Sequence, residues 1–300
     1  MCPARALTPS LREELVFLVT NRIPRRYATL LMGWFSSIES RRLARLTIAV
    51  WRRFADLRLD EAETREFTSL RACFTRRLRP GVRPIDAAGD VVVSPCDGIV
   101  GACGRIDDTT LVQAKGLTYT LEELLRDRAL AARHRGGTFV TLRLTPAMYH
   151  RFHAPCDGRL TSVRYVAGDT WNVNPVTVRR VAQLFCRNER AVLDVRLTSA
   201  SHALTLVPVA AILVAGIVLH ALPDTLDLRY RGDDVIACDA SFAKGDELGF
   251  FQHGSTILVL ASCGFAPCAS VVEGRVVRMG EPLLRLHGTP LSAPPPSSPS

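Results

Sequence analysis

The chain has 300 residues and is 47% hydrophobic, so it can bury a substantial core in one or two domains. This composition excludes a disordered chain, and the formal net charge of +9 indicates an anionic partner. The nine cysteines are odd in number and form no CxxC pair, and the apolar run at 15–19 is too short for a secretory signal. We therefore expect free thiols in a reducing, cytoplasmic setting.

The positive charge is concentrated at the N-terminus, where residues 1–60 contain eleven arginines and five acidic residues. Between residues 21 and 60, apolar side chains recur at helical spacing and predict two amphipathic helices, the second over Arg42–Phe54. A further short helix is expected over Phe67–Leu78, before Pro80 and Pro84 end the helical region.

Two kinds of anionic partner suit this basic segment, nucleic acid and anionic lipid. The sequence shows no zinc-finger spacing, no aromatic RNA-binding signature and no evident helix-turn-helix, so nucleic acid is not expected. Trp34 and Phe35 beside arginines suit the headgroup layer of a bilayer. The alternative is an ordinary helix pair packed on its own domain.

After residue 85 the sequence changes to short β-rich runs separated by turn signals such as Asp97-Gly98 and Asp157-Gly158. The expected strands are 91–95, 138–144, 159–166, 191–197 and 256–262, with helical insertions at 121–134 and 176–184. This pattern predicts an α+β fold in which N-terminal amphipathic helices lie on a predominantly β core with short helical insertions. The predicted domains are a helical basic head at 1–80, a β-rich core at 81–290 and a disordered Pro/Ser tail at 291–300.

Residues 204–222 form an uncharged run that approaches the length of a membrane span. Pro208, Gly216 and the Val/Ile-rich alternation favour two buried strands instead.

Residues Gly254, Ser255 and Thr256 carry the chemistry that organises the interpretation. A glycine ahead of a serine lets the Ser255 hydroxyl reach the Gly254 carbonyl. An N-to-O acyl shift followed by elimination would free residues 1–254 and leave a dehydroalanine that hydrolyses to a pyruvoyl group. Because this tripeptide is common in plain turns, its context must supply the specificity.

Two upstream segments supply that context, since SPCDG at 94–98 and YHRFHAPCDG at 149–158 place an aspartate and two histidines before the serine. With these segments the chain resembles the bacterial, membrane-associated, pyruvoyl-dependent phosphatidylserine decarboxylases. The resemblance runs from about residue 30 to 290 and includes VRPID (82–86), QAKGLTYTLEELL (113–125), YVAGDTWNVNP (165–175), LFCRNERAVL (184–193) and KGDELGFF (244–251).

The resemblance implies that Asp97, His153 and Ser255 form a processing triad, and that His150 donates a proton in the decarboxylation. The cofactor would be a covalent pyruvoyl group made from Ser255, which forms a Schiff base with the substrate, without a metal or pyridoxal phosphate. The substrate would be phosphatidylserine in an anionic membrane, and the products phosphatidylethanolamine and CO2. Cleavage after Gly254 would give a heterodimer of chains 1–254 and 255–300, and whether two such heterodimers associate is left open. The protein would be bound peripherally at the cytoplasmic face of the cell membrane.

The residues themselves leave alternatives open. Ser255 needs a positioned base, and His153 oriented by Asp97 would provide one, but an Asp before Gly is usually a turn residue and a lone histidine usually structural. On a strand or turn the His150 and His153 rings would point in different directions, whereas on a helix they would share a face. A helical pair could bind a metal ion, but a third ligand is not evident.

Two other functions also fit parts of the sequence. A serine hydrolase would explain the subtilisin-like order Asp97, His153, Ser255, although the GxSxG elbow is absent. A peripheral lipid-binding protein that has lost processing would explain the head. Against the family pattern, His253 replaces a commonly apolar residue beside the scissile bond, and Cys96 replaces a small residue.

Overall fold

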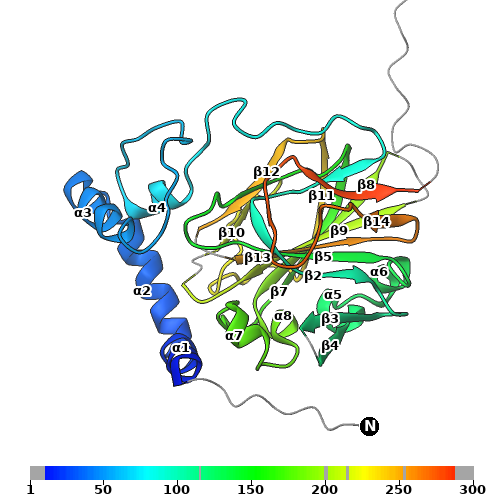
Figure 1. Cartoon of the computed structure of the whole chain (residues 1–300), viewed down its shortest axis with the longest axis horizontal. Coiled ribbons are helices and arrows are strands. Elements are labelled where there is room, and N and C mark those ends of the chain that lie inside the picture. The colour runs from blue at the N-terminus through cyan, green and yellow to red at the C-terminus, as the bar shows by residue number, and fades with distance from the viewer. Residues whose placement is uncertain (1–10, 115, 199–201, 214–215, 253–254, 288–300) are drawn as a thin grey trace, which may run out of the picture.

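The computed structural model describes residues 11–114, 116–198, 202–213, 216–252 and 255–287. Helices form an arm along one side of a mainly antiparallel β core, at the left in Figure 1. They are α1 (Leu11–Asn21), α2 (Arg25–Ser37), α3 (Arg41–Trp51) and the short α4 (Leu70–Phe74). The predicted α+β class, with helices preceding a β core, is thus confirmed.

The N-terminal helices are separated by residues that favour chain turns and caps. Pro24 stands between α1 and α2, and the Ser40 side chain accepts a hydrogen bond from the Leu43 amide at the start of α3. Helix α1 was not predicted. Its side chains contact the core at residues 177–180: the Asn21 amide donates to the Thr177 hydroxyl over 2.8 Å, Glu13 and Glu14 pair with Arg179 and Arg180, and Arg180 lies over the Phe17 ring. The predicted helix at 67–78 is shorter than expected and spans only α4.

The core is built on an eight-stranded antiparallel sheet. Its strand order is β11 (Val235–Phe242), β7 (Gly158–Val166), β8 (Arg190–Leu197), β9 (Ala203–Ala210), β13 (Ser255–Ala261), β5 (Thr138–Arg143), β2 (Gly98–Arg105) and β15 (Val276–Val277). Every residue of β9 and β13 is buried. Such strands cannot show the alternation of a one-faced sheet, and they read as continuous apolar runs.

Three smaller sheets and four short helices complete the described core. The sheets join β1 (Val91–Val93), β16 (Pro282–Leu286) and β14 (Phe265–Pro267); β10 (Ile217–Leu219), β12 (Glu247–Phe251) and β6 (Arg151–His153); and β3 (Thr110–Ala114) with β4 (Leu117–Thr120). The helices are α5 (Leu121–Leu125), α6 (Arg128–Arg133), α7 (Pro175–Val178) and α8 (Leu184–Arg187).

The helical insertions are more broken than predicted. The expected helix at 121–134 is interrupted by Arg126, which has a left-handed φ of 54°, and Asp127 then caps α6 through the Leu130 amide. The expected helix at 176–184 is likewise divided between α7 and α8. In each case a residue with a left-handed φ, Arg126 or Gln183, breaks the helix where the pattern alone suggested continuation.

The uncharged run at 204–222 forms β9 and β10, as predicted. Within the described ranges, no helix has both the length and the apolar character that a bilayer crossing requires. The predicted tail at 291–300 lies outside the described residues, and the proposed domain boundaries remain predictions.

Glu189 is a buried carboxyl at the start of β8, and burial raises its pKa from an ordinary 4.5 to about 7. The folded chain holds this proton more tightly than the unfolded chain. The contribution of Glu189 to the free energy of unfolding is therefore fully present below pH 4.5 and is lost as pH rises through 7. We expect Glu189→Gln to stabilise the protein at pH 8, by on the order of 2 kcal/mol, and much less at pH 5.

Urea unfolding of the intact chain at both pH values measures this difference. The exposed Glu273→Gln is the matched control, since it removes the same charge from the surface. A stabilisation by Glu189→Gln that is equal at pH 5 and pH 8 would contradict the role of burial.

Candidate active site

Ser255 begins β13 and lies between β9 and β5 in the centre of the large sheet. It pairs with Ala210 on β9, and its carbonyl accepts the Leu144 amide over 2.8 Å. The residue is fully buried, and its hydroxyl has no hydrogen-bond partner among the described residues. The buried hydroxyl of Thr256 on the same strand also lacks a partner in the described part of the chain, so the Ser255 hydroxyl is not unusual by burial alone. Its position directly after Gly254 is what makes it a candidate for processing.

The loop between β5 and β6, residues 144–150, holds the chain on both sides of the predicted cleavage point. At one end the Leu144 amide donates to Ser255, and at the other the Phe251 amide donates to the His150 carbonyl over 3.0 Å. His253 and Gly254 lie outside the described residues. Phe251 and Ser255, which flank residues 252–254, are therefore both hydrogen-bonded to this one loop.

His150 lies at the end of that loop and is fully buried. Its ring stacks on Phe74 of α4 with centroids 4.4 Å apart, and its Nε2 lies 3.2 Å from the Pro146 carbonyl. Phe74 in turn stacks on Trp51 of α3 at 5.0 Å. The imidazole is therefore held where the helical arm meets the core.

His153, on β6, has a partner at each ring nitrogen. Nδ1 lies 2.8 Å from the Gly245 carbonyl, and Nε2 lies 2.9 Å from the Tyr149 hydroxyl. A carbonyl can only accept, so Nδ1 carries the proton and the Nε2 lone pair accepts from Tyr149. Burial lowers the pKa of His153, although the Gly245 carbonyl and Glu247 act in the opposite direction. The ring is thus neutral at pH 7 and can accept a proton.

Asp97 is nearly buried and is paired with a different residue from the one expected. Arg83 donates to both of its oxygens, Nε to Oδ1 at 2.9 Å and Nη2 to Oδ2 at 2.6 Å, and the Met279 amide also donates to Oδ1. Arg83 also donates to Glu61 at 2.7 Å. The hydrogen bonds and charges of these acids outweigh burial and raise the pKa of Arg83, so its positive charge is secure.

The structure brings the predicted triad residues into one region without joining them. The His153 amide donates to the Pro95 carbonyl over 2.7 Å, which places the loop of Asp97 beside β6. Across the described part of the chain, no hydrogen bond links Asp97 to His153 or His153 to Ser255. The triad roles therefore remain a prediction.

Sequence reasoning missed Tyr149, Arg83 and Gly245 as site residues. All three lie inside the segments used to identify the family, YHRFH, VRPID and KGDELGFF. Gly245 has a left-handed φ of +94°, and a Cβ there would meet Ile85 Cδ1 at 2.1 Å, so the glycine fixes where its carbonyl points.

A cavity of about 460 Å³ lies between the helical arm and the residues at the ends of β5 and β9. It adjoins His150 through Phe74 and Pro146, and Ser255 through Leu144. Its lining is mainly apolar, with Arg143 among the polar members. A second cavity of about 600 Å³ shares Trp51 and Pro146 with the first and is lined by Asp97, Arg83 and Tyr149.

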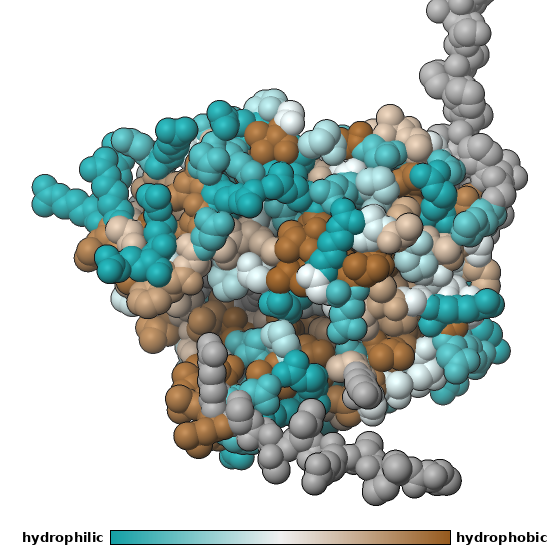
Figure 2. Space-filling view, viewed as in Figure 1, coloured by the Kyte–Doolittle hydropathy of each residue, from teal (hydrophilic) through white to brown (hydrophobic). Residues whose placement is uncertain are grey.

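The arm carries most of the exposed apolar surface. Of sixteen large apolar side chains exposed in the described residues, eleven lie between residues 11 and 54. They are Leu11, Leu15, Leu18, Val19, Ile23, Tyr27, Leu31, Trp34, Leu46, Val50 and Phe54. Figure 2 shows hydrophobic surface over α1 and hydrophilic side chains around α3. This combination of unburied apolar groups and arginines is typical of a surface that meets a membrane.

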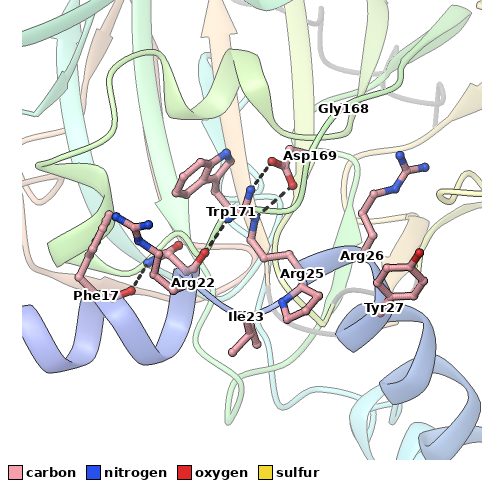
Figure 3. A pocket seen from close by; sticks show the side chains of 11 residues that line it. Phe17, Arg22, Ile23, Arg25, Arg26, Tyr27, Gly168, Asp169 and Trp171 are labelled. Carbon is pink, nitrogen blue, oxygen red and sulfur yellow. Dashed lines mark hydrogen bonds and ion pairs between the residues drawn. The ribbon is translucent and has the colours of Figure 1, made fainter.

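The arm is fixed to the core at the joint between α1 and α2 (Figure 3). Arg25 stacks over the Trp171 ring at 3.9 Å and donates to both oxygens of Asp169, at 3.1 and 2.5 Å. A cavity of about 790 Å³ lies at this joint and is lined by Arg25, Asp169 and Trp171 together with Arg22 and Arg26. The segment 165–175 therefore has a structural role in holding the arm.

Comparison with known proteins identifies the family. The model of the family described as phosphatidylserine decarboxylase matches residues 70–285. A phosphatidylserine decarboxylase proenzyme of Yersinia pestis (strain Pestoides F) is 35% identical over 91% of this chain and 96% of its own. Another, from Anaeromyxobacter sp. (strain K), is 42% identical over 70% of this chain and 76% of its own.

The tautomer of His153 provides a test of the site geometry. We expect the intact protein to show the Nδ1-protonated form, with a pKa below that of a free histidine, in long-range ¹H–¹⁵N NMR spectra. Gly245→Ala should populate both tautomers, because an alanine is strained at a φ of +94° and the backbone that carries the carbonyl must shift.

Gly116→Ala is the matched control, since Gly116 also has a positive φ, +81°, but open space around its Cβ position. An Nε2-protonated ring in the unaltered protein would overturn the assignment, as would a Gly245→Ala ring identical to it.

Proposed function

The chain belongs to the phosphatidylserine decarboxylase family, and we propose how its own residues carry out that reaction. Members are made as proenzymes, and the activity is the pyruvoyl-dependent conversion of phosphatidylserine to phosphatidylethanolamine and CO2. The observation that supports our assignment best is Ser255, whose buried hydroxyl has no partner among the described residues and whose backbone partner Leu144 lines a cavity. In this chain we assign cleavage to the Gly254–Ser255 bond.

Processing begins with the Ser255 hydroxyl, which is a poor nucleophile until a base takes its proton. His153 serves as that base, because its Nε2 lone pair is free of a proton. Since Nε2 already accepts from Tyr149, the proton passes by way of the Tyr149 hydroxyl or Tyr149 turns away. Asp97, held by Arg83, acts through its negative charge, which favours the imidazolium.

The atoms balance without an added reagent other than water. The Ser255 oxygen attacks the Gly254 carbonyl, the amide nitrogen takes a proton, and an ester replaces the amide. Loss of the Ser255 α-proton then expels the Gly254 carboxylate and leaves dehydroalanine. Water converts this to the pyruvoyl group and ammonia. A group at residue 255 would be one hydrogen-bonded residue away from the 460 Å³ cavity, because Leu144 lines that cavity and its amide donates to the Ser255 carbonyl.

The pyruvoyl carbonyl supplies an electrophile for the substrate amine and takes up the electron pair released with CO2. His150 holds the proton that replaces CO2 on carbon. Its ring is kept in place by the Phe74 stack and the Pro146 carbonyl, beside the same cavity. The family supplies the pyruvoyl group, and the expectation of no metal and no pyridoxal phosphate stays a prediction.

The two chains stay associated because of where the cut falls. Chain 255–300 contains β13, which pairs with β9 on one side and β5 on the other, and β16, which pairs with β1. Chain 1–254 therefore encloses the small chain in its central sheet. The exposed apolar arm binds an anionic bilayer peripherally, at the cytoplasmic face of the cell membrane.

The other functions considered have less support. A serine hydrolase needs a nucleophile that an external substrate can reach, whereas Ser255 is fully buried. A binding protein without processing is disfavoured by membership of a family whose members are made as proenzymes.

A denaturing gel tests the processing roles. We expect the purified protein to split into chains 1–254 and 255–300, and Ser255→Ala to stay intact and inactive. His153→Ala should stay largely intact because the nucleophile loses its base, and Asp97→Asn should be cleaved more slowly. His150→Ala should be cleaved normally but release CO2 at least about 100-fold more slowly, since it lacks the acid.

Hydroxylamine labelling of the small chain shows whether His150→Ala carries the carbonyl. The roles would be reversed if His150→Ala stayed uncleaved while His153→Ala matured normally. A whole, unlabelled chain with full decarboxylase activity would refute the cleavage itself.

Membrane attachment is tested on one exposed residue of the arm. Leu31→Asp, at a side chain that is 62% exposed on α2, should weaken sedimentation with anionic vesicles about tenfold, and added salt should weaken binding of the unaltered protein. Val272→Asp, at a core residue that is 55% exposed, should leave vesicle binding unchanged. Equal effects of the two substitutions would show that the arm is not the contact surface.

A further inference from the structure

Arg143, the last residue of β5, is the one cationic side chain that lines the 460 Å³ cavity in the described structure. It lies directly across from Thr256 in the register of β5 and β13, one residue from Ser255. Directly opposed residues on antiparallel strands have Cα atoms about 4.5–5.5 Å apart. The guanidinium therefore originates next to the predicted reaction centre.

Within the described residues, Arg143 forms no ion pair and no hydrogen bond that would neutralise it. Three other arginines with little exposed surface do have hydrogen-bond partners. Arg71 donates to the Gly33 carbonyl, Arg76 to the Ala147 carbonyl, and Arg151 to Glu247. Burial lowers the pKa of Arg143, and no acidic group acts on it to oppose that effect. A desolvated cation without a partner is costly, which indicates that something else supplies the negative charge.

The walls of the cavity indicate what carries that charge. One side is formed by the arm, through Met32, Leu70 and Phe74, and the other by core residues that include Val173, Ile212 and Leu213. An apolar slot with one guanidinium suits an amphiphile that places an anionic group at that point. The slot also begins at the arm, whose exposed apolar residues we assign to the membrane.

We propose that Arg143 binds the phosphodiester of the phospholipid substrate, with its glycerol and proximal acyl carbons along the apolar walls of this cavity. The proposal rests on the function assigned above and names the group that positions its substrate. Three bonds separate the phosphorus from the serine α-carbon, a span comparable to the separation of opposed strands. The phosphate can thus reach Arg143 while the amine reaches residue 255.

The substrate has a second anionic group, its carboxylate, but that group leaves as CO2. A cation bound to the carboxylate would stabilise the starting state and slow its loss. A cation bound to the phosphodiester holds a group that is the same in substrate and product. Arg143 is therefore a positioning residue, and its contact should be equal for phosphatidylserine and phosphatidylethanolamine.

Binding is measured on the full-length chain with Ser255→Ala, which cannot form the carbonyl or turn over lipid. The probes are dihexanoyl phosphatidylserine and dihexanoyl phosphatidylethanolamine below their micelle concentrations, dihexanoylglycerol, and inorganic phosphate, each followed by calorimetry. Adding Arg143→Gln should weaken binding of both phospholipids by roughly 10- to 100-fold, the value of a hydrogen bond to a charged group. Dihexanoylglycerol, which has no phosphate, should bind equally to the Ser255→Ala protein and to the protein that also carries Arg143→Gln.

Arg143→Lys should restore part of the affinity, because it keeps the charge but not the two-pronged geometry. Arg128→Gln, at an exposed arginine of α6, is the matched control and should change no affinity. In the chain with Ser255 intact, Arg143→Gln should still be cleaved and should show a raised KM with a smaller change in kcat.

Three results would overturn the proposal. A loss confined to phosphatidylserine would assign Arg143 to the carboxylate, and inorganic phosphate binding as tightly as the lipids would show a free phosphate site. Unchanged binding of both phospholipids by Arg143→Gln would remove the contact altogether. Failure of the proposed function is distinguishable from these results, because it would appear as an uncleaved protein whatever residue occupies position 143.

Discussion

The pairing of β13 between β9 and β5 is the constraint on which the rest of the site depends. This strand is buried along its whole length, and its first residue is Ser255. The hydrogen bond from Leu144 to Ser255 fixes the start of the loop that carries His150, and the bond from Phe251 to His150 fixes its end. Ser255 and His150, to which we assign the roles of nucleophile and proton donor, are thus positioned by one short stretch of backbone, which needs no direct contact between their side chains.

Arginine takes several distinct roles in this chain because its planar guanidinium suits different acceptors. Arg83 neutralises the buried pair of Glu61 and Asp97, and Arg25 fastens the arm through Asp169 and Trp171. Arg190 is buried and donates only to backbone carbonyls, including those of Leu124 and Cys186. Arg143 differs from all of these in having no partner among the described residues, and that difference is the basis for assigning it to substrate.

Much of the fold could be predicted from the sequence because the central strands are rich in Val, Ile and Leu and are bounded by turn residues. The expected runs at 138–144, 159–166, 191–197 and 256–262 correspond to β5, β7, β8 and β13. Strand β2 was missed because it is rich in glycine, and the edge strand β11 because its residues are half exposed. Helix α1 was missed because its sequence has little amphipathic periodicity. Contacts with the core such as that of Asn21 with Thr177 join residues far apart in the sequence.

The site was predictable as a set of residue types and less so as a set of contacts. Asp97, His150, His153 and Ser255 were predicted because the segments that contain them resemble the family pattern, and their roles stay predictions. Their partners Arg83, Tyr149 and the Gly245 carbonyl depend on tertiary register, for which local spacing carries no signal. A backbone carbonyl, in particular, has no sequence signature at all.

The central position of β13 has a consequence for the lifetime of the mature enzyme. Before the cut, the strand finds its place between β9 and β5 within a single chain. After the cut that we propose at Gly254, the same sheet would be shared by two polypeptides, so any unfolding that separates them would make recovery a second-order encounter that depends on concentration. The shorter polypeptide would then expose seven consecutive residues that are all buried in the native sheet, an aggregation-prone edge. Durability of the processed protein is therefore governed by its rate of unfolding, and the energy difference between folded and unfolded proenzyme does not describe it.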